Sequence, residues 1–389
     1  MRIGIVTETY PPEVNGVALT VHGFANGLAR RGHDVQVIRP RHPQRLTDID
    51  APGMSSIEVA GVSMPRYAGL RFGLPARRLL ATHWREERPD AVYVATEGPL
   101  GGSAVAIAKR LGIPVATGFH TRFDAYASHY GVGFLTPLVR AYLARFHRRA
   151  QATVVSTRAL ADELIGIGVP HARVLRRAVD TRLFHPSRRD ERLRANWQVE
   201  PETPVVLYVG RIAPEKNLDL AVKAFRTLQR QVPSARYVWV GDGPARAELQ
   251  ARHPDFIFTG VLRGEALAAH YASADLFVFP SLSETFGNVV LEALAAGVPV
   301  VAYDDGAARD YIDNGSNGIR IAVGNPSSFI ERAAALGADL PRRRAMGQNA
   351  HLSTSSLTPD SVITEFESLM RRLTEELPHE RHAAIAARA

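Results

Sequence analysis

The chain of 389 residues is 46% hydrophobic and 22% charged, as expected of a soluble globular protein, and its length exceeds one ordinary core, so two domains are expected. It contains no cysteine, which excludes disulfides and thiolate–metal sites, and no stretch approaches the ~20 apolar residues of a membrane span. Its formal net charge of +8 comes from the first half, because residues 1–186 carry +10 and the remainder carries −2.

Apolar segments of strand length alternate with helical patterns through the first half. Helices are expected between the strands, for example over 17–31 and 136–150. Continuous apolar strands separated by helices predict a parallel sheet that is covered on both faces. The expected strands are 2–8, 34–40, 91–96, 114–120 and 152–156.

The same alternation restarts after a polar, Pro-containing stretch at 180–189, which is the best hinge candidate. We therefore expect an α/β chain of two Rossmann-like domains facing across a cleft, with boundaries at 1–183 and 184–389. A packed terminal helix is expected around Phe366 and Leu369, followed by a loose tail over 378–389. The strands expected in the second half are 204–210, 235–241, 256–260, 275–280 and 298–303.

Ligands of doubly wound sheets bind at the carboxyl ends of the strands, so polar residues just after strands are the candidates. Asn15 and Gly16 precede a helix after the first strand, where a glycine lets a phosphate or sugar approach the backbone. No G-x-G-x-x-G follows any expected strand, which disfavours an NAD or FAD enzyme. His120 ends the strand 114–120 and is expected to point into the cleft, although a histidine can also be purely structural.

Two cations follow the first strand of the second half. Arg211 closes the strand, and Lys216 stands just before a helix in a chain that has only three lysines. A compact ammonium suits a phosphate oxygen, so the pair predicts a clamp for a diphosphate. Taken alone, Lys216 could equally be an exposed loop cation.

The segment from Ser281 to Tyr303 reads as a polar loop, an apolar helix and a strand. The free N–H groups near Phe286, Gly287 and Asn288 can hold a phosphate or sugar hydroxyls. Glu284 could instead belong to the helix cap and Glu292 to a solvated face. The surroundings of Glu292 are apolar, however, so its carboxylate needs a partner such as the two hydroxyls of a ribose.

The segments "GRIAPEKN" and "SETFGNVVLEALAAGVPVVA", with "TETYPPEVNGV", "GFHTRFDAY" and "AVDTRLFHP", resemble the family-4 retaining glycosyltransferases of GT-B fold. Two departures are Asn15 and Ala178, where many members have glycine. The resemblance covers nearly the whole chain, and it implies a role for each matching residue. Gly16, Arg211 and Lys216 would bind the donor diphosphate. His120 and Glu284 would bind the transferred sugar, and Glu292 would hold the ribose. The expected substrate site also includes Asn15, Tyr126, Leu262, Thr285, Phe286, Gly287 and Asn288.

The resemblance also implies transfer with retention, without a metal ion or other cofactor. Asp48 and Asp50 form a D-x-D sequence, which is the metal-binding motif of a different transferase fold. They stand in a polar connection, so we interpret them as part of a solvated loop. A glycosidase pair is disfavoured, because Glu284 and Glu292 would be about 12 Å apart if both were helical. A nucleotide-sugar epimerase and a nonenzymatic binding protein are the remaining alternatives.

Within the family, the first segment and the His120–Tyr126 region look most like GDP-mannose-dependent α-mannosyltransferases and UDP-sugar-dependent diacylglycerol glycosyltransferases. We expect mannosyl transfer from GDP-mannose to a lipid or glycan, with the base read near 260–263. No nucleic acid partner is expected. The basic segments 70–88 and 136–150 mix Arg with large apolar residues, so a cytoplasmic protein that is peripheral on the inner face of the plasma membrane is expected. The alternative is that these helices have only a solvated basic face.

Overall fold

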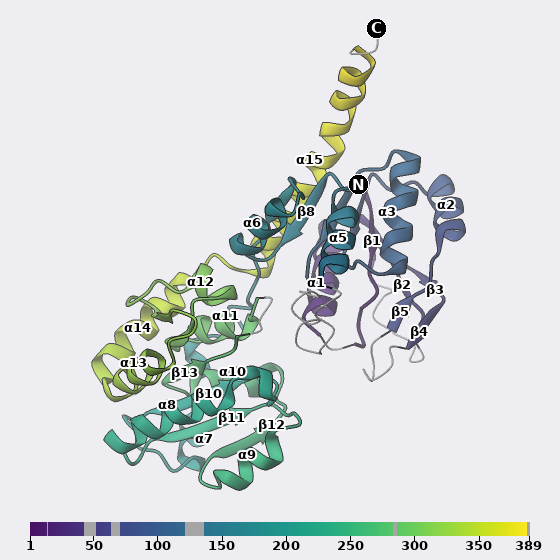
Figure 1. Ribbon diagram of the computed structural model, residues 1–389. Helices are drawn as coiled ribbons and strands as arrows, with labels where there is room; N and C mark the ends of the chain where they lie inside the picture. The colour runs from purple at the N-terminus through teal and green to yellow at the C-terminus, as the bar shows by residue number, and fades with distance from the viewer. Residues whose placement is uncertain (14, 43–51, 64–70, 121–135, 283–285, 387–389) are drawn as a thin grey trace. The chain divides into compact units, whose positions relative to one another are not determined.

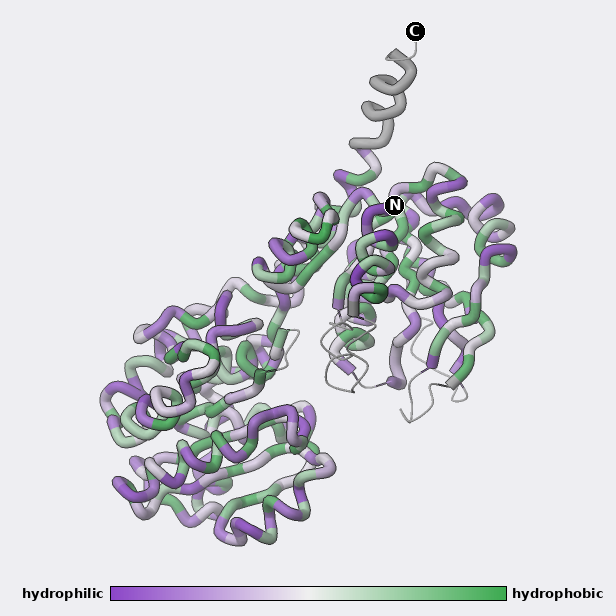
Figure 2. The backbone as a smooth tube through the Cα atoms, in the orientation of Figure 1, coloured by the Kyte–Doolittle hydropathy of each residue, from purple (hydrophilic) through white to green (hydrophobic). Residues whose placement is uncertain are grey.

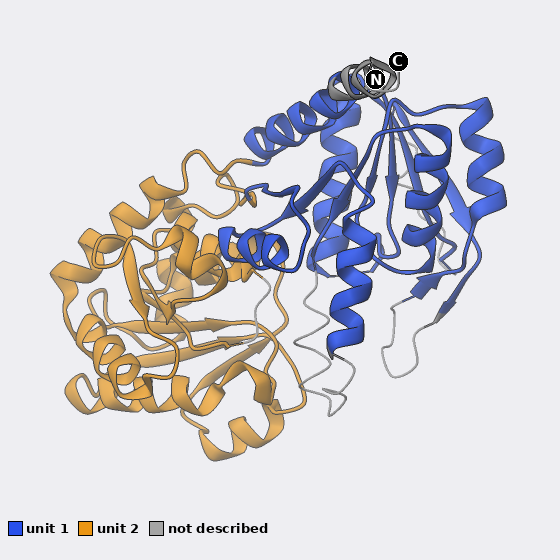
Figure 3. Cartoon of the chain, turned by 45° about the horizontal axis from the view of Figure 1, so that its top comes forward, with its two compact units in different colours: residues 1–176, 359–389 blue, residues 177–358 orange. Residues whose placement is uncertain are grey.

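The computed structural model describes residues 1–13, 15–42, 52–63, 71–120, 136–282 and 286–386. The chain divides into two compact units: unit 1 is Met1–Arg176 together with Pro359–Ala389, and unit 2 is Arg177–Thr358 (Figure 3). Each unit is built around its own parallel sheet with helices between the strands (Figure 1). This confirms the α/β fold of two Rossmann-like domains that the alternation of the sequence predicts.

The sheet of unit 1 has seven strands within the described residues, in the order β3-β2-β1-β6-β7-β8-β9. Every neighbouring pair in it is parallel. The strands are β1 (Arg2–Val6), β2 (Asp34–Pro40), β3 (Met54–Val59), β6 (Ala91–Val94), β7 (Val115–Gly118), β8 (Ala152–Val155) and β9 (Ala172–Val174), and β4 (Gly61–Ser63) and β5 (Arg71–Gly73) form a separate antiparallel pair.

Helices cover both faces of this sheet, as the alternating side chains of its central strand require. On β6, Val92 and Val94 join a buried cluster with residues of α2, α3 and α5. Tyr93 points to the opposite face, where it contacts Phe24 of α1 and Phe366 of α15. The helices of unit 1 are α1 (Gly16–Arg30), α2 (Arg77–Glu86), α3 (Pro99–Leu111), α5 (Thr136–His147), α6 (Arg158–Gly166) and α15 (Pro359–Ala386).

The terminal helix α15 therefore completes the core of unit 1. Phe366 is fully buried and stacks on Phe24, with ring centroids 4.2 Å apart. Arg31, which follows α1, donates a hydrogen bond of 3.0 Å to Glu367. The aromatic stack and the ion pair both fix α15 against α1.

Unit 2 has a six-stranded parallel sheet within the described residues, in the order β12-β11-β10-β13-β14-β15. Its strands are β10 (Val205–Val209), β11 (Arg236–Val240), β12 (Ile257–Gly260), β13 (Leu276–Phe279), β14 (Val300–Tyr303) and β15 (Gly318–Ile321). Its helices are η2 (Pro186–Arg188), α7 (Glu191–Asn196), η3 (Pro214–Lys216), α8 (Leu218–Gln231), α9 (Arg246–Arg252), α10 (Gly264–Ala272), α11 (Asn288–Ala295), α12 (Gly306–Tyr311), α13 (Pro326–Ala338) and α14 (Leu340–Ser353).

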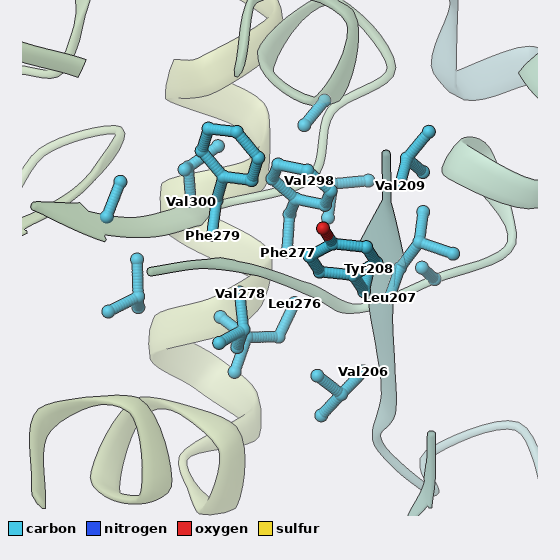
Figure 4. Close-up of a cluster of buried hydrophobic side chains, with 14 of the residues drawn as sticks. Val206, Leu207, Tyr208, Val209, Leu276, Phe277, Val278, Phe279, Val298 and Val300 are labelled. Atoms are coloured by element: carbon cyan, nitrogen blue, oxygen red, sulfur yellow. The ribbon is translucent and has the colours of Figure 1, made fainter. Parts of the chain in front are cut away.

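The core of unit 2 is built on the central strands β10 and β13. All residues of both strands are buried, with Tyr208 and Phe277 among the largest side chains in the cluster (Figure 4). The helices, by contrast, alternate between hydrophobic and hydrophilic residues along their length (Figure 2). Burial of one helix stripe against a continuous apolar strand is what makes the sequence pattern of this unit so regular.

The structure divides the chain differently from the expected domains 1–183 and 184–389. The division after the first sheet falls at Arg176, and the terminal helix belongs to unit 1, because its apolar face packs on α1. The expected loose tail over 378–389 is also different, since α15 extends to Ala386. Alanines are strong helix formers, and the segment contains no glycine to end the helix.

We predict that Phe366→Ala destabilises unit 1 by about 3–5 kcal/mol, because it removes a buried aromatic ring and leaves a cavity. Amide hydrogen exchange should accelerate in β1, β6 and β7 while the core of unit 2 keeps its protection. The control is Leu352→Ala on α14, whose side chain is largely exposed and which should change stability little. Equal acceleration in both sheets would contradict this assignment of α15.

Candidate functional site

The strand order of unit 2 creates a point at which connections diverge. β10 lies at the centre of the sheet, with β11 on one side and β13 on the other. The chain runs from β10 towards one edge of the sheet and, after β12, returns to β13 and continues towards the other edge. In such sheets ligands bind beyond the carboxyl ends of the strands at this point. The loops after β10 and β13 are therefore the first place to look for a site.

Arg211 and Lys216 both stand on the loop that follows β10, as the sequence predicts. The Tyr208 hydroxyl donates a 3.0 Å hydrogen bond to the carbonyl oxygen of Arg211, which fixes the start of the loop. The Arg211 side chain is 58% exposed and lies 3.2 Å from Glu215. Lys216 ends η3 and is partly exposed. The loop thus presents two cations at the end of the central strand.

The loops after β10 and β13 are tied together. Asn217 has a left-handed backbone with φ of +56°, and its side-chain amide donates to the carbonyl oxygen of Pro280 over 3.4 Å. Beyond Pro280, Phe286 is buried and Gly287, with φ of +92°, precedes α11 without a side-chain cap. Asn288 at the start of α11 is exposed. Glu284 and Thr285 lie outside the described residues.

Glu292 is the partly buried carboxyl of this site. It lies on α11, and its Oε2 atom accepts a 2.9 Å hydrogen bond from the hydroxyl of Tyr271 on α10. Burial raises the pKa of Glu292, and the Tyr271 hydroxyl opposes that rise. The same environment raises the pKa of the fully buried Tyr271 well above its usual value. The sequence analysis predicts that the carboxylate of Glu292 needs a hydrogen-bond partner. The hydroxyl of Tyr271 supplies one such partner within the protein.

A glycine turn that sequence reasoning missed completes the edge of the sheet. Gly241 and Gly243 follow β11, with φ of +136° and +159°. A Cβ atom on Gly241 would lie 2.0 Å from the carbonyl oxygen of Gly210, and one on Gly243 would lie 2.3 Å from that of Ile212. Only glycine permits this close approach to the Arg211 loop. The sequence does contain a signal for this turn, because "GDG" stands at the end of the strand expected over 235–241.

Leu262 lies at the carboxyl end of the next strand, β12, in the region where the base is expected. The residue is partly buried against the core of unit 2. The Gly241 N–H donates to the carbonyl oxygen of Gly260 over 2.8 Å, which joins the ends of β11 and β12. Unit 2 therefore gathers Arg211, Lys216 and Leu262 at the carboxyl edge of its sheet.

In unit 1, Asn15 and Gly16 stand where the loop after β1 enters α1. The Asn15 side chain caps this helix, because its Oδ1 atom accepts from the Ala18 N–H over 2.8 Å. Its amide also donates to the Thr9 hydroxyl over 2.6 Å. Gly16 is the exposed first residue of α1. The asparagine thus holds the helix terminus, and the glycine leaves its backbone accessible.

His120 follows β7 and is buried, with 8% of its surface exposed. Its Nε2 atom lies 2.6 Å from the hydroxyl oxygen of Tyr93 on β6. This contact orients the imidazole, and it could not be read from the sequence because it joins two different strands. Tyr126, a few residues further on, lies outside the described residues.

Glu8 is a buried carboxyl that sequence reasoning missed. It follows β1, is 5% exposed, and accepts a 3.0 Å hydrogen bond from the N–H of Leu100 at the start of α3. Burial raises the pKa of Glu8 to about 7, against the backbone N–H groups of Leu100 and Gly101 that lower it. Glu8 therefore joins the two elements that flank the point where the connections of this sheet diverge.

Across the described ranges, no group of three or more His, Cys, Asp or Glu side chains is placed to hold a metal ion. Asp48 and Asp50 lie outside those ranges.

Comparison with characterised proteins shows a likeness along nearly the whole chain. The chain is 35% identical over 379 residues to a GDP-mannose-dependent alpha-mannosyltransferase of Mycolicibacterium smegmatis, covering 96% of this chain and 98% of the relative. It is 28% identical over 340 residues to the alpha-monoglucosyldiacylglycerol synthase of Acholeplasma laidlawii, covering 82% and 84% of the two chains.

Solved structures show the same fold at lower identity. The crystal structure of Anabaena HepE in complex with UDP superimposes with a TM-score of 0.77 at 17% identity, covering 96% of this chain and 100% of the other. This likeness shows that the chain has the GT-B fold.

Two family descriptions divide the chain between them. Residues 14–183 match Glycosyltransferase Family 4, and residues 189–352 match Glycosyl transferases group 1. The gap between the two matches, after residue 183, lies a few residues beyond Arg176, where the first unit gives way to the second. With the relatives at this identity and coverage, the chain belongs to these glycosyltransferases, and the protein is an enzyme of that class.

Proposed function

We propose that this glycosyltransferase moves a mannosyl residue from GDP-mannose to a lipid or glycan acceptor, with retention of configuration and without a metal ion. The observation that carries the proposal is the full-length likeness to a GDP-mannose-dependent alpha-mannosyltransferase. The alternative is a UDP-sugar-dependent diacylglycerol glycosyltransferase, which the likeness to a monoglucosyldiacylglycerol synthase favours.

The two cations of the β10 loop are proposed to stabilise the leaving diphosphate. When the bond between the anomeric carbon and the diphosphate oxygen breaks, the electron pair stays on the oxygen and negative charge accumulates there. Arg211 and Lys216 lie on one short loop at the central strand. Glu215, 3.2 Å from Arg211, holds the guanidinium near this position. Fixed charges of this kind stabilise the transition state more than the ground state.

The remaining donor contacts follow from the carboxyl edge of unit 2. Glu292 is proposed to accept hydrogen bonds from the two ribose hydroxyls. Each carboxylate oxygen can accept two hydrogen bonds, so the carboxylate keeps acceptor positions after one oxygen has accepted from Tyr271. Glu284 and Thr285, with the uncapped start of α11 at Phe286–Asn288, are proposed to hold the transferred sugar. Leu262 is proposed to lie against the base.

Unit 1 is proposed to supply the acceptor side and the contacts to the reacting sugar. His120, held by Tyr93, is proposed to contact the sugar near the bond that breaks. Asn15 and Gly16 are proposed to leave the start of α1 open to the diphosphate. Tyr126 is proposed to contribute to the same surface.

Peripheral attachment to the inner face of the plasma membrane is part of the proposal. The first half carries the excess of +10, and Leu138 and Tyr142 on α5 and Leu79 on α2 are exposed. Leu143 and Phe146 of α5 are buried in unit 1, so only some of the large apolar residues of this helix are free to contact a membrane. None of the helices in the described ranges combines the length and hydrophobicity that a bilayer span requires.

The donor assignment predicts that purified enzyme releases GDP from GDP-mannose when it is given a bacterial lipid or glycan extract. The assay should run in excess EDTA, because charged side chains are proposed to replace a metal. UDP-glucose in a parallel reaction is the control. Release of UDP alone would support the alternative donor, and loss of activity in EDTA with recovery in Mg²⁺ or Mn²⁺ would contradict the metal-free mechanism.

The clamp predicts that Arg211→Ala and Lys216→Ala each lower kcat/KM by about two to three orders of magnitude, the usual effect of losing one preorganised charge contact. The matched controls are Lys223→Ala and Arg230→Ala, which remove exposed cations from α8. Activity within threefold of the parent enzyme in both loop variants would eliminate the clamp.

The pair of Tyr271 and Glu292 predicts a pH effect on nucleotide binding. The ionised carboxylate is the better acceptor for ribose hydroxyls, so GDP affinity should fall as pH drops through the raised pKa of Glu292. Tyr271→Phe removes a hydrogen bond that lowers this pKa. The acidic loss of affinity should therefore move to higher pH, with roughly tenfold weaker binding at the acidic end.

Calorimetric titration with GDP from about pH 5 to about pH 8 measures this shift. Tyr237→Phe is the matched control, because Tyr237 is fully buried in the same core and its hydroxyl has no hydrogen-bond partner in the structure. If GDP affinity depends on pH in the same way in both variants, Tyr271 does not affect nucleotide binding and the prediction is wrong.

A further inference from the structure

A pocket of about 510 Å³ lies within unit 1. Its walls come from the start of α2, the first turns of α3, and the second half of α5 with the residues just after it. These are the two basic, amphipathic segments of the sequence, brought together around one cavity. A volume of this size is in the range of small-molecule sites.

Three arginines line the pocket, Arg77 from α2 and Arg145 and Arg149 from the end of α5. Among the described residues, no carboxylate pairs with any of these three side chains. Other arginines of the same segment do have partners, since Arg140 lies 3.6 Å from Glu163 and the Arg148 side chain donates to the carbonyl oxygen of Ala144 over 3.2 Å. Arg77, Arg145 and Arg149 thus face the cavity without a carboxylate partner among the described residues.

Arg77 is also placed against the local electrostatics of its helix. It is the first residue of α2, which has no acidic residue in its first turn and no side-chain cap. A cation at the positive end of a helix is unfavourable, whereas an anion there is favourable. A bound anion would offset both the charge of Arg77 and the positive end of α2, and unfavourable local arrangements of this kind are expected at functional sites.

The carboxylates close to the pocket are engaged elsewhere. Glu97 lies 3.4 Å from His147, and both side chains are buried. Glu8 accepts the N–H of Leu100. Neither carboxylate neutralises the three arginines, so the pocket keeps its positive charge.

Apart from Ser103, the rest of the lining is mainly apolar. Phe146 is 5% exposed and Tyr142 packs beside it, with ring centroids 6.3 Å apart. Pro99 at the start of α3 and Pro75 before α2 also line the cavity. The pocket thus offers three guanidinium groups beside apolar walls.

We infer that this pocket binds the phosphoryl group of an anionic phosphate ester, either a phospholipid headgroup or a soluble polyol phosphate. Guanidinium groups present paired N–H donors that match the terminal oxygens of a phosphate. The apolar walls contact the carbon portion of the ester. The inference concerns ligand binding alone and does not depend on the identity of the sugar donor.

The experiment compares two triple variants that remove the same charge from the same segments. The pocket variant is Arg77→Gln, Arg145→Gln and Arg149→Gln. The matched control is Arg78→Gln, Arg140→Gln and Arg148→Gln, three arginines that do not line the pocket. Thermal melting checks that both fold, and Arg145→Gln alone gives a second, milder pocket variant.

Each protein is titrated with glycerol 3-phosphate and with inorganic phosphate, and is sedimented with phosphatidylcholine vesicles with and without phosphatidylglycerol, at constant ionic strength. The pocket triple should lose about a thousandfold in affinity for the probe that binds, since each of the three charge-assisted contacts contributes roughly tenfold. The control should change by less than threefold in the two soluble titrations and should weaken vesicle binding less than the pocket triple does. Loss in the glycerol phosphate titration identifies a soluble ester, and loss confined to anionic vesicles identifies a lipid headgroup.

The inference is overturned if the parent protein binds neither soluble probe and both triples reduce vesicle binding equally, because the charge would then act only as a diffuse surface. GDP affinity is measured in parallel and should be the same in the pocket triple and the parent. A parent protein that fails to bind GDP would count against the proposed donor and leave the pocket result to be judged on its own titrations.

Discussion

The parallel direction of every strand pair in the two main sheets is the constraint on which the site depends. Because each strand ends at the same edge as its neighbours, residues that are distant in sequence meet without any direct interaction between them. The cations after β10, the glycine turn after β11 and the start of α11 after β13 are gathered in this way. The chemistry of unit 2 is thus a consequence of strand direction and order before it is a matter of individual contacts.

Two carboxyls, the buried Glu8 and the partly buried Glu292, show how each unit maintains this arrangement at its own sheet. Glu8 reaches from the end of β1 to the N–H of Leu100, and Glu292 receives the hydroxyl of Tyr271. Burial raises the pKa of both groups. A desolvated carboxyl is costly unless donors surround it, so each one requires its neighbouring helix to stay in register. Each carboxyl thus helps to hold the local fold beside a candidate site.

The sequence predicts the central strands well, because those strands are buried on both faces and read as continuous apolar runs. It misses β3 and β9, whose exposed residues break the apolar pattern at the sheet edge. It also counts the terminal helix with the second domain, whereas α15 packs in unit 1. The apolar spacing around Phe366 identifies a packed helix but contains no information about which core receives it, and only the stack on Phe24 answers that question.

The candidate site shows the same division. Arg211, Lys216 and Glu292 could be proposed from the sequence alone. Each is a charged residue that closely follows an apolar strand or interrupts an apolar helix, and this pattern needs no knowledge of the fold. Tyr93 and Tyr271 could not be found, because each is an ordinary core aromatic until its hydroxyl meets His120 or Glu292 across the fold. Gly241 lies between these cases, since its role depends on the backbone of a neighbouring loop.

Because α15 belongs to unit 1, unit 2 is an insertion within the chain of the first domain. On a ribosome, the described strands of unit 1 emerge first but lack the helix that covers Tyr93 and Phe24 until α15 is made. Unit 2, by contrast, is contiguous and is made before α15. We expect the second domain to begin folding while the first still waits for α15. A chain interrupted before α15 would leave an open apolar face on the first domain, so completion of this domain depends on the helix that is furthest from its strands in sequence.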